Sequence, residues 1–194
     1  MQTDCEKTVL KIMQRIPGKT NLDGMAYLCE LVQELEAPGW FVDLGTYHGR
    51  SAMVLIQSSL GTRQGRKVIT IDNYTEGPDA KDPDAGSPPD FWAVKGRLKC
   101  RGRVQMVYGD VADVPVLCQG QPIALVFVDA DHTRDGVLAC IEAWKPLVSE
   151  GGIMAFDDYG SPRWPDVQPV VDEMMADWER LDCRGSVVAF RRKE

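Results

Sequence analysis

The sequence lacks the long apolar segments and the regular cysteine patterns that mark membrane proteins and disulfide-rich proteins. No apolar run approaches the roughly 18 residues that span a bilayer, and the N-terminus is polar, so we expect neither a membrane span nor a signal peptide. The six cysteines form no C-x-x-C pair, and most lie in apolar stretches, where thiols pack as small hydrophobic side chains. We therefore expect a protein of the reducing cytoplasm.

Positive charge is also scarce. The 22 Lys and Arg residues are outnumbered by 29 Asp and Glu residues, which gives a formal net charge of −7. Because proteins bind nucleic acids largely through Lys and Arg, this balance disfavours a nucleic-acid partner and favours small molecules. The length of 194 residues, 44% of them hydrophobic, suits one well-buried domain over residues 1–194. Whether the chain forms a homo-oligomer stays open.

The pattern of apolar residues predicts an α/β fold. Apolar residues at helical spacing predict two cap helices within residues 1–38, separated at Pro17-Gly18. Five short apolar runs then alternate with helical segments, as in a parallel sheet with right-handed crossovers. An amphipathic helix and two short strands, around Leu181 and at 187–190, end the chain. The five runs are 40–44, 68–71, 104–107, 123–128 and 153–156.

One segment departs from this alternation. Residues 75–89 are rich in Pro, Gly and Asp and show no periodicity, so we expect a loop. The loop follows the second strand, at the edge where open α/β sheets bind ligands. We interpret it as a substrate-facing lid, with a surface bulge as the alternative.

The loop after the first predicted strand is typical of a nucleotide-cofactor site. In FVDLGTYHGRS, Asp43 ends the strand, and Gly45 and Gly49 allow main-chain N–H groups to approach a ligand at the start of a helix. The spacing fits neither G-x-G-x-x-G nor a P-loop. The alternative is an ordinary turn from strand to helix.

An acidic strand end followed by G-x-x-x-G resembles motif I of the class I S-adenosylmethionine (SAM) methyltransferases. The resemblance implies a Rossmann-like fold with a seven-stranded, mostly parallel sheet that ends in an antiparallel hairpin. It also implies that the carboxylate side of the loop faces the methionine ammonium, that Asp72 accepts from the ribose diol, and that Asp110 and Val111 meet the adenine. The predicted cofactor contacts are Asp43, Gly45, Thr46, Tyr47, Gly49, Ser51, Asp72, Asn73, Asp110, Val111 and Asp129.

Four carboxylates follow the fourth and fifth predicted strands, which are neighbours in such a sheet. Asp129 and Asp131 come from VDADH, and Asp157 and Asp158 come from FDDY. Carboxylates that close together repel one another unless a cation neutralises them, and Mg²⁺ prefers oxygen ligands. We therefore predict a Mg²⁺ site. The alternative is that Asp131 faces solvent and Asp158 caps a turn.

The combination of VDADH-T-x-x-G-V with GG-x-x-x-FDDY resembles the macrocin-type sugar O-methyltransferases and their small relatives. The resemblance covers roughly residues 41–159. It implies that Asp129, Asp157 and Asp158 bind the metal and that His132 is the general base. Arg134 departs from the usual pattern of these relatives, which affects the predicted surroundings of the substrate.

We therefore expect a SAM-dependent methyltransferase that acts on a hydroxyl of a small-molecule acceptor, such as a sugar, a phenol or a natural product. Two alternatives remain open. One is a SAM-binding regulatory or scaffold protein without activity. The other is a Rossmann oxidoreductase, which the missing G-x-G-x-x-G disfavours. Methylation of nucleic-acid amino groups is disfavoured because Asp129-Ala130-Asp131-His132 stands where an Asp/Asn-Pro-Pro-Tyr/Phe loop is needed.

Overall fold

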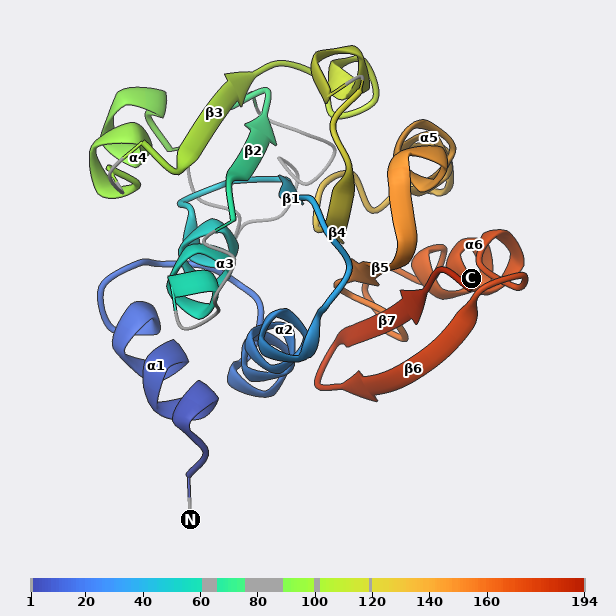
Figure 1. Cartoon of the computed structure of the whole chain (residues 1–194), viewed down its shortest axis with the longest axis horizontal. Coiled ribbons are helices and arrows are strands. Elements are labelled where there is room, and N and C mark those ends of the chain that lie inside the picture. Colours follow the sequence, from blue (N-terminus) through green and yellow to red (C-terminus); the bar gives the residue numbers. More distant parts are fainter. Residues whose placement is uncertain (1, 61–65, 76–88, 100–101, 119, 194) are drawn as a thin grey trace.

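The computed structural model describes residues 2–60, 66–75, 89–99, 102–118 and 120–193 (Figure 1). Most of the predicted lid, residues 76–88, lies outside these ranges. The elements are α1 (Asp4–Met13), α2 (Leu22–Glu34), β1 (Trp40–Leu44), α3 (Arg50–Leu60), β2 (Val68–Asp72), α4 (Phe91–Arg97), β3 (Val104–Tyr108), η2 (Val114–Cys118), β4 (Ile123–Val128), α5 (Arg134–Trp144), η3 (Lys145–Leu147), β5 (Val148–Phe156), α6 (Val167–Met174), β6 (Glu179–Arg184) and β7 (Val187–Arg191).

The seven strands form one sheet in the order β3-β2-β1-β4-β5-β7-β6. The strands β1 to β5 pair with one another in parallel, whereas β7 pairs antiparallel with both β5 and β6. This confirms the predicted seven-stranded, mostly parallel sheet with its antiparallel C-terminal hairpin. The strand order reverses between β1 and β4, and ligands of open α/β sheets bind at such a switch point.

Side chains alternate between the two faces of the sheet, as they do in any strand. Each face is covered by helices (Figure 1). Phe41 and Leu125 pack on the face covered by α1, α2 and α3, whereas Val42 and Val126 pack on the face covered by α5 and α6. Every residue of β4 is buried, as expected for a central parallel strand. The two predicted cap helices are α1 and α2, which pack against each other and against α3.

Two further features concern the helices and the cysteines. Within the described ranges, none of the helices has the length and apolar character needed to cross a membrane. All five described cysteines are free thiols, and Cys183 is the exposed one among them. The other four are buried, as small hydrophobic side chains would be.

Candidate active site

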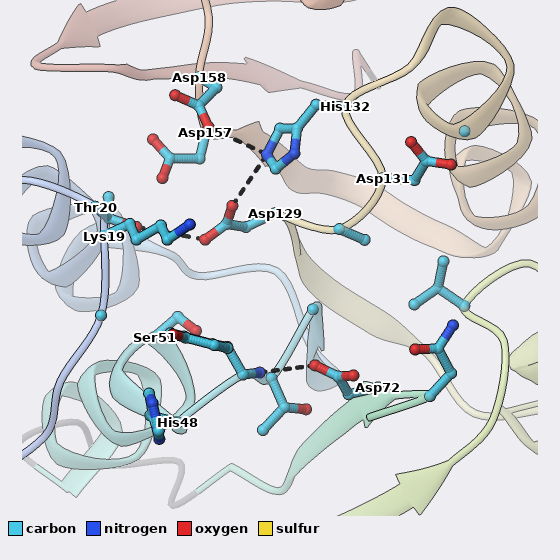
Figure 2. Close-up of a pocket in the computed structure, with 18 of the residues that line it drawn as sticks. Lys19, Thr20, His48, Ser51, Asp72, Asp129, Asp131, His132, Asp157 and Asp158 are labelled. Atoms are coloured by element: carbon cyan, nitrogen blue, oxygen red, sulfur yellow. Dashed lines mark hydrogen bonds and ion pairs between the residues drawn. The ribbon is translucent and has the colours of Figure 1, made fainter. Parts of the chain in front are cut away.

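A cavity of about 620 Å³ opens at the carboxyl ends of the parallel strands. Its volume lies within the range of about 300–1,000 Å³ that is usual for small-molecule sites. The loop after β1 and the ends of β2 and β3 line one part of the cavity. The residues after β4 and β5, together with the segment between α1 and α2, line the other part (Figure 2).

The loop after β1 is pressed against the chain that leaves β4. The Gly45 N–H donates to the Ile71 carbonyl oxygen (2.9 Å), and the Gly49 N–H donates to the Thr46 carbonyl oxygen (2.7 Å). Gly45 has a φ of 90°, and a Cβ at this position would lie 1.8 Å from the Asp129 carbonyl oxygen. Only glycine allows this close approach. Of the predicted cofactor contacts, Gly45, Thr46, Tyr47 and Ser51 line the cavity.

Asp43 and Gly49 are placed differently from the other predicted contacts, because neither is among the described residues that line the cavity. Asp43 is fully buried beneath the loop, where its Oδ2 accepts a hydrogen bond from the Thr70 hydroxyl (2.7 Å). Burial raises the pKa of Asp43 to about 7. Asp43 therefore lies on the buried side of the loop, away from the cavity, and Gly49 forms part of the turn.

Asp72 lies at the end of β2 with its carboxylate at the cavity wall. One oxygen accepts from the Tyr47 N–H (2.7 Å) and the other from the Tyr74 N–H (2.6 Å). Burial nevertheless raises the pKa of Asp72. Each oxygen retains a lone pair for a further donor. The neighbouring Asn73 also lines the cavity, and its Oδ1 accepts from the Thr75 N–H (3.1 Å).

The turn after β3 forms the next part of the wall. Asp110 and Val111, the predicted adenine contacts, both line the cavity. Asp110 Oδ1 accepts from the Ala112 N–H (2.9 Å), which folds the turn locally. The Val111 carbonyl oxygen accepts a hydrogen bond from the indole N–H of the fully buried Trp144 (2.7 Å). The core side chain on α5 thus fixes the position of this turn.

An acidic cluster with a histidine lies at the other part of the cavity. His132 Nε2 lies 3.1 Å from Asp158 Oδ2 and 3.4 Å from Asp129 Oδ1. Ligand atoms of these three residues lie within 4.8 Å of one another. Asp158 has a φ of 54°, an uncommon conformation for a residue other than glycine. Asp129, His132 and Asp158 therefore form a compact group, as Figure 2 shows.

Asp157 and Asp131 differ in their relation to this group. Asp157 is buried and lines the cavity, and one of its oxygens accepts from the Ser186 hydroxyl. Burial, and after it the charge of Asp129, raise the pKa of Asp157 to about 7. Asp131 instead accepts from the Thr133 N–H (2.8 Å) at the start of α5, and it lies apart from the group in Figure 2. Two of the four predicted carboxylates, Asp129 and Asp158, thus lie in the group with His132.

Sequence reasoning missed the part of the wall that comes from the segment between α1 and α2. The Thr20 hydroxyl donates to Asp129 Oδ2 (3.4 Å), and Lys19 also lines the cavity. Arg50, the first residue of α3, holds the segment by donating to the carbonyl oxygens of Ile16 (3.0 Å) and Thr20 (3.1 Å). Pro17-Gly18 signalled only a break between helices, and no local pattern indicated that the break would reach Asp129.

Two further cavity residues were also missed. Ser186 lies in the turn between β6 and β7, and Trp164 lies between β5 and α6. The Trp164 indole stacks on the His132 imidazole with ring centroids 4.9 Å apart and planes at 18°. Both residues come from C-terminal turns without chemical motifs, so only the folded chain reveals them.

Two residues that the sequence singled out do not join the acidic cluster. His48 lies in the loop after β1, with Nδ1 3.2 Å from Arg97 and its ring against Tyr47. Arg134 lies on the surface of α5, where it pairs with Glu173 of α6 (3.5 Å). The departure from the family pattern at Arg134 therefore does not alter the described cavity wall.

The donor set at the acidic cluster suits a divalent cation. Asp129 and Asp158 supply carboxylate oxygens, which Mg²⁺ and Ca²⁺ prefer, and Asp157 lies next to them in the cavity wall. His132 could add an imidazole nitrogen, a ligand better suited to transition metals. The residues present therefore fit such an ion, with Asp129, His132 and Asp158 as the group whose ligand atoms lie within 4.8 Å of one another. Asp157, a predicted ligand, is not part of this group.

The strand order and the cavity at the switch point define a Rossmann-like fold of the methyltransferase type. Residues 42–159 match the family of methyltransferase domains, and the chain belongs to this family. This match spans the loop after β1, both acidic strand ends and His132.

Similar proteins and structures agree with this family. An uncharacterised protein of Acanthamoeba polyphaga mimivirus is 38% identical over 143 residues, which cover 71% of this chain and 59% of that protein. A rhamnosyl O-methyltransferase of Mycobacterium bovis is 28% identical over 129 residues, which cover 66% of this chain and 49% of that protein. The chain thus spans about half to three fifths of the length of these curated relatives.

Solved structures share the fold over almost the whole chain. The O-methyltransferase NovP superposes with a TM-score of 0.74 at 15% identity, covering 98% of this chain and 97% of that one. CalS11, a TDP-rhamnose 3'-O-methyltransferase of calicheamicin biosynthesis, superposes with a TM-score of 0.63 at 18% identity, covering 98% and 96%. Because the sequence identities are only 15% and 18%, these superpositions show a shared fold and nothing more.

Proposed function

We propose that this protein transfers the methyl group of SAM to a hydroxyl group of a small molecule, such as a sugar, a phenol or a natural product. The observation that carries the proposal is the position of His132 Nε2 between Asp129 and Asp158, at the edge of a cavity whose other wall holds Asp72 and Asp110. The names of the rhamnosyl O-methyltransferase and of CalS11 favour a sugar hydroxyl among these acceptors.

The wall from the loop after β1 to Val111 is the proposed SAM site. SAM supplies an activated methyl group when it is bound, so the protein has mainly to align an oxygen and remove its proton. The loop at 45–49 borders the methionine part, Asp72 accepts from the ribose hydroxyls, and Asp110 and Val111 face the adenine. Asp72 suits this role because both of its oxygens are held in place by backbone N–H groups.

His132 is the proposed general base. Nε2 faces the acidic cluster that borders the cavity, so it is the nitrogen that accepts the proton of the acceptor hydroxyl. The imidazolium that forms is stabilised by the adjacent charges of Asp129 and Asp158. A neutral imidazole can act as a base near neutral pH.

Asp129, Asp157 and Asp158 are the proposed ligands of a Mg²⁺ ion. A bound Mg²⁺ would lower the pKa of an acceptor hydroxyl and orient it. The proximity of His132 to the same carboxylates raises a second arrangement, in which His132 binds the metal instead of Asp157. A residue cannot serve as ligand and base through the same nitrogen, so metal affinity separates the two arrangements.

The experiment compares His132→Ala with His48→Ala, because these are the two histidines of the chain. Both proteins are assayed for release of S-adenosylhomocysteine with sugar and phenol acceptors, and Mg²⁺ binding is measured by calorimetry. As a base, His132 contributes roughly 10²–10⁴-fold to kcat, so His132→Ala should lose that much while its Mg²⁺ affinity stays unchanged. His48→Ala should lose less kcat than His132→Ala, because His48 lines the cavity at the loop after β1 and not at the acidic cluster.

Two results would contradict parts of this proposal. Unchanged kcat in His132→Ala would exclude the base, and a large loss of Mg²⁺ affinity in that variant would make His132 a ligand. Full activity after EDTA treatment and exhaustive metal removal would exclude the Mg²⁺ site. Binding of S-adenosylhomocysteine without turnover on any acceptor would favour the regulatory or scaffold alternative.

A further inference from the structure

One short segment between β5 and α6 contacts the His132 imidazole from two directions. Asp158, which follows β5 closely, meets the ring edge at Nε2 (3.1 Å). Trp164, six residues later, lies against the ring face, with centroids 4.9 Å apart and planes at 18°. The edge contact fixes where Nε2 points, and the face contact fixes the tilt of the ring.

The segment itself is folded tightly enough to hold these two groups in place. The Ser161 N–H donates to the Asp158 carbonyl oxygen (3.1 Å), the Trp164 N–H donates to the Ser161 carbonyl oxygen (3.1 Å), and the Val167 N–H donates to the Trp164 carbonyl oxygen (3.2 Å). The last of these bonds joins Trp164 to the first residue of α6. Asp158 and Trp164 are therefore linked by consecutive turns.

The indole is itself supported on several sides. It packs against the core cluster beneath α5 and α6, and the Arg163 guanidinium lies over it, 5.4 Å from its centroid. It also borders the cavity, and the His132 side chain beside it is only 11% exposed. A leucine at this position would leave one face of the imidazole without a flat partner, and the ring could then rotate about its χ2 torsion, which has broad minima.

We propose that Trp164 is the positioning residue that fixes the plane of the His132 imidazole, so that Nε2 stays directed at Asp129 and Asp158. Trp164 acts through His132 and not on SAM, so its loss should reduce turnover and leave the cofactor site intact. The kinetic part rests on the proposed function. The stacking part does not, because it can be measured in an inactive protein.

Proton NMR tests the stack directly, since only two histidines contribute imidazole signals. Protons above the face of an indole are shifted upfield by its ring current. The His132 signals, assigned with the His48→Gln variant, should lie upfield in the wild type and move downfield in Trp164→Leu, at one fixed pH. Trp92→Leu is the matched control, because Trp92 is exposed and does not line the described cavity.

Kinetics test the positioning. Misplacement of a reacting group by about 1 Å can cost about 10²-fold in rate, so Trp164→Leu should lower kcat by roughly 10–10²-fold. The KM values for SAM and the acceptor should stay within about 2-fold. Trp164→Phe should recover most of the rate, because a phenyl ring still offers a flat face. Thermal unfolding establishes that each variant is folded.

Three outcomes would overturn the proposal. His132 signals that do not move in Trp164→Leu would exclude the stack. Unchanged kcat in a folded Trp164→Leu protein would exclude positioning, and equal losses in Trp164→Leu and Trp164→Phe would indicate a different role for the indole. If the wild type has no methyltransferase activity but the His132 signals do shift, the proposed function fails while the stack stands.

Discussion

Replacement of Gly45 by alanine should destabilise the protein through one backbone contact. A left-handed residue other than glycine costs about 1–2 kcal/mol, and Gly45 has a φ of 90°. The new Cβ would also lie 1.8 Å from the Asp129 carbonyl oxygen, so one of the two chains must move. Overpacking of this kind costs about 1–3 kcal/mol. We expect a total loss of about 2–5 kcal/mol in the free energy of unfolding.

Urea denaturation measures this loss against a matched control. Gly102 has a φ of 72°, but a Cβ there would meet nothing within 4 Å, so Gly102→Ala carries only the conformational cost of about 1–2 kcal/mol. With a slope near 2 kcal/mol per molar urea, the Gly45→Ala midpoint should fall by about 1–2.5 M. The Gly102→Ala midpoint should fall by less than 1 M.

The difference between the two variants is the free energy of the contact between the loop and Asp129. Because Asp129 carries a carboxylate of the acidic cluster, Gly45→Ala should also weaken activity, whereas Gly102→Ala should not. Equal losses of stability in the two variants would refute the reasoning. They would show that the chain after β4 moves away from a new Cβ without cost.

Three further predictions concern residues around the cavity. The folded-state pKa of Asp43 is about 7 and its unfolded value about 3.9, so folding favours the neutral carboxyl. The free energy of unfolding of the wild type should therefore fall relative to that of Asp43→Asn as pH rises from about 4 to about 7, by at most about 4 kcal/mol. Urea denaturation at several pH values measures this difference, and a difference that does not change with pH would exclude the effect. Arg50→Met removes two hydrogen bonds that hold the segment ending at Thr20, and should raise the acceptor KM more than the KM for SAM. Equal changes in both constants would argue against this anchoring role. Trp144→Phe removes the bond to the Val111 carbonyl oxygen and should weaken binding of S-adenosylhomocysteine by about 1–2 kcal/mol in calorimetry, an effect that unchanged affinity would rule out.

The fold followed from periodicity that is local in the sequence. Ile123–Val128 is apolar at every position, as expected for a strand covered on both faces, and the structure buries all of it. The glycine loop and the acidic strand ends were recognisable for the same reason, because strand, turn and helix are adjacent in the chain. We could also predict that the glycine loop and the acidic strand ends lie together, because the carboxyl ends of parallel strands meet at one edge of a sheet.

The parts that could not be predicted depend on contacts between distant segments. Thr20 reaches Asp129 across 109 residues, and Trp164 lies in a Pro-containing stretch without periodicity. The burial of the Asp43 side chain could have been inferred from the sequence. Strand alternation places it on the same face as Phe41, beneath α3, and not over the open edge of the sheet.

The most direct test of the central claim is a calorimetric titration of S-adenosylhomocysteine and of NADH into the wild type and Asp72→Ala. We expect S-adenosylhomocysteine to bind the wild type at one site and NADH not to bind. Asp72→Ala should weaken that binding by about 1.5–3 kcal/mol, or roughly 10- to 150-fold, because the ribose hydroxyls lose a charged acceptor. Binding of NADH without binding of S-adenosylhomocysteine would contradict the account.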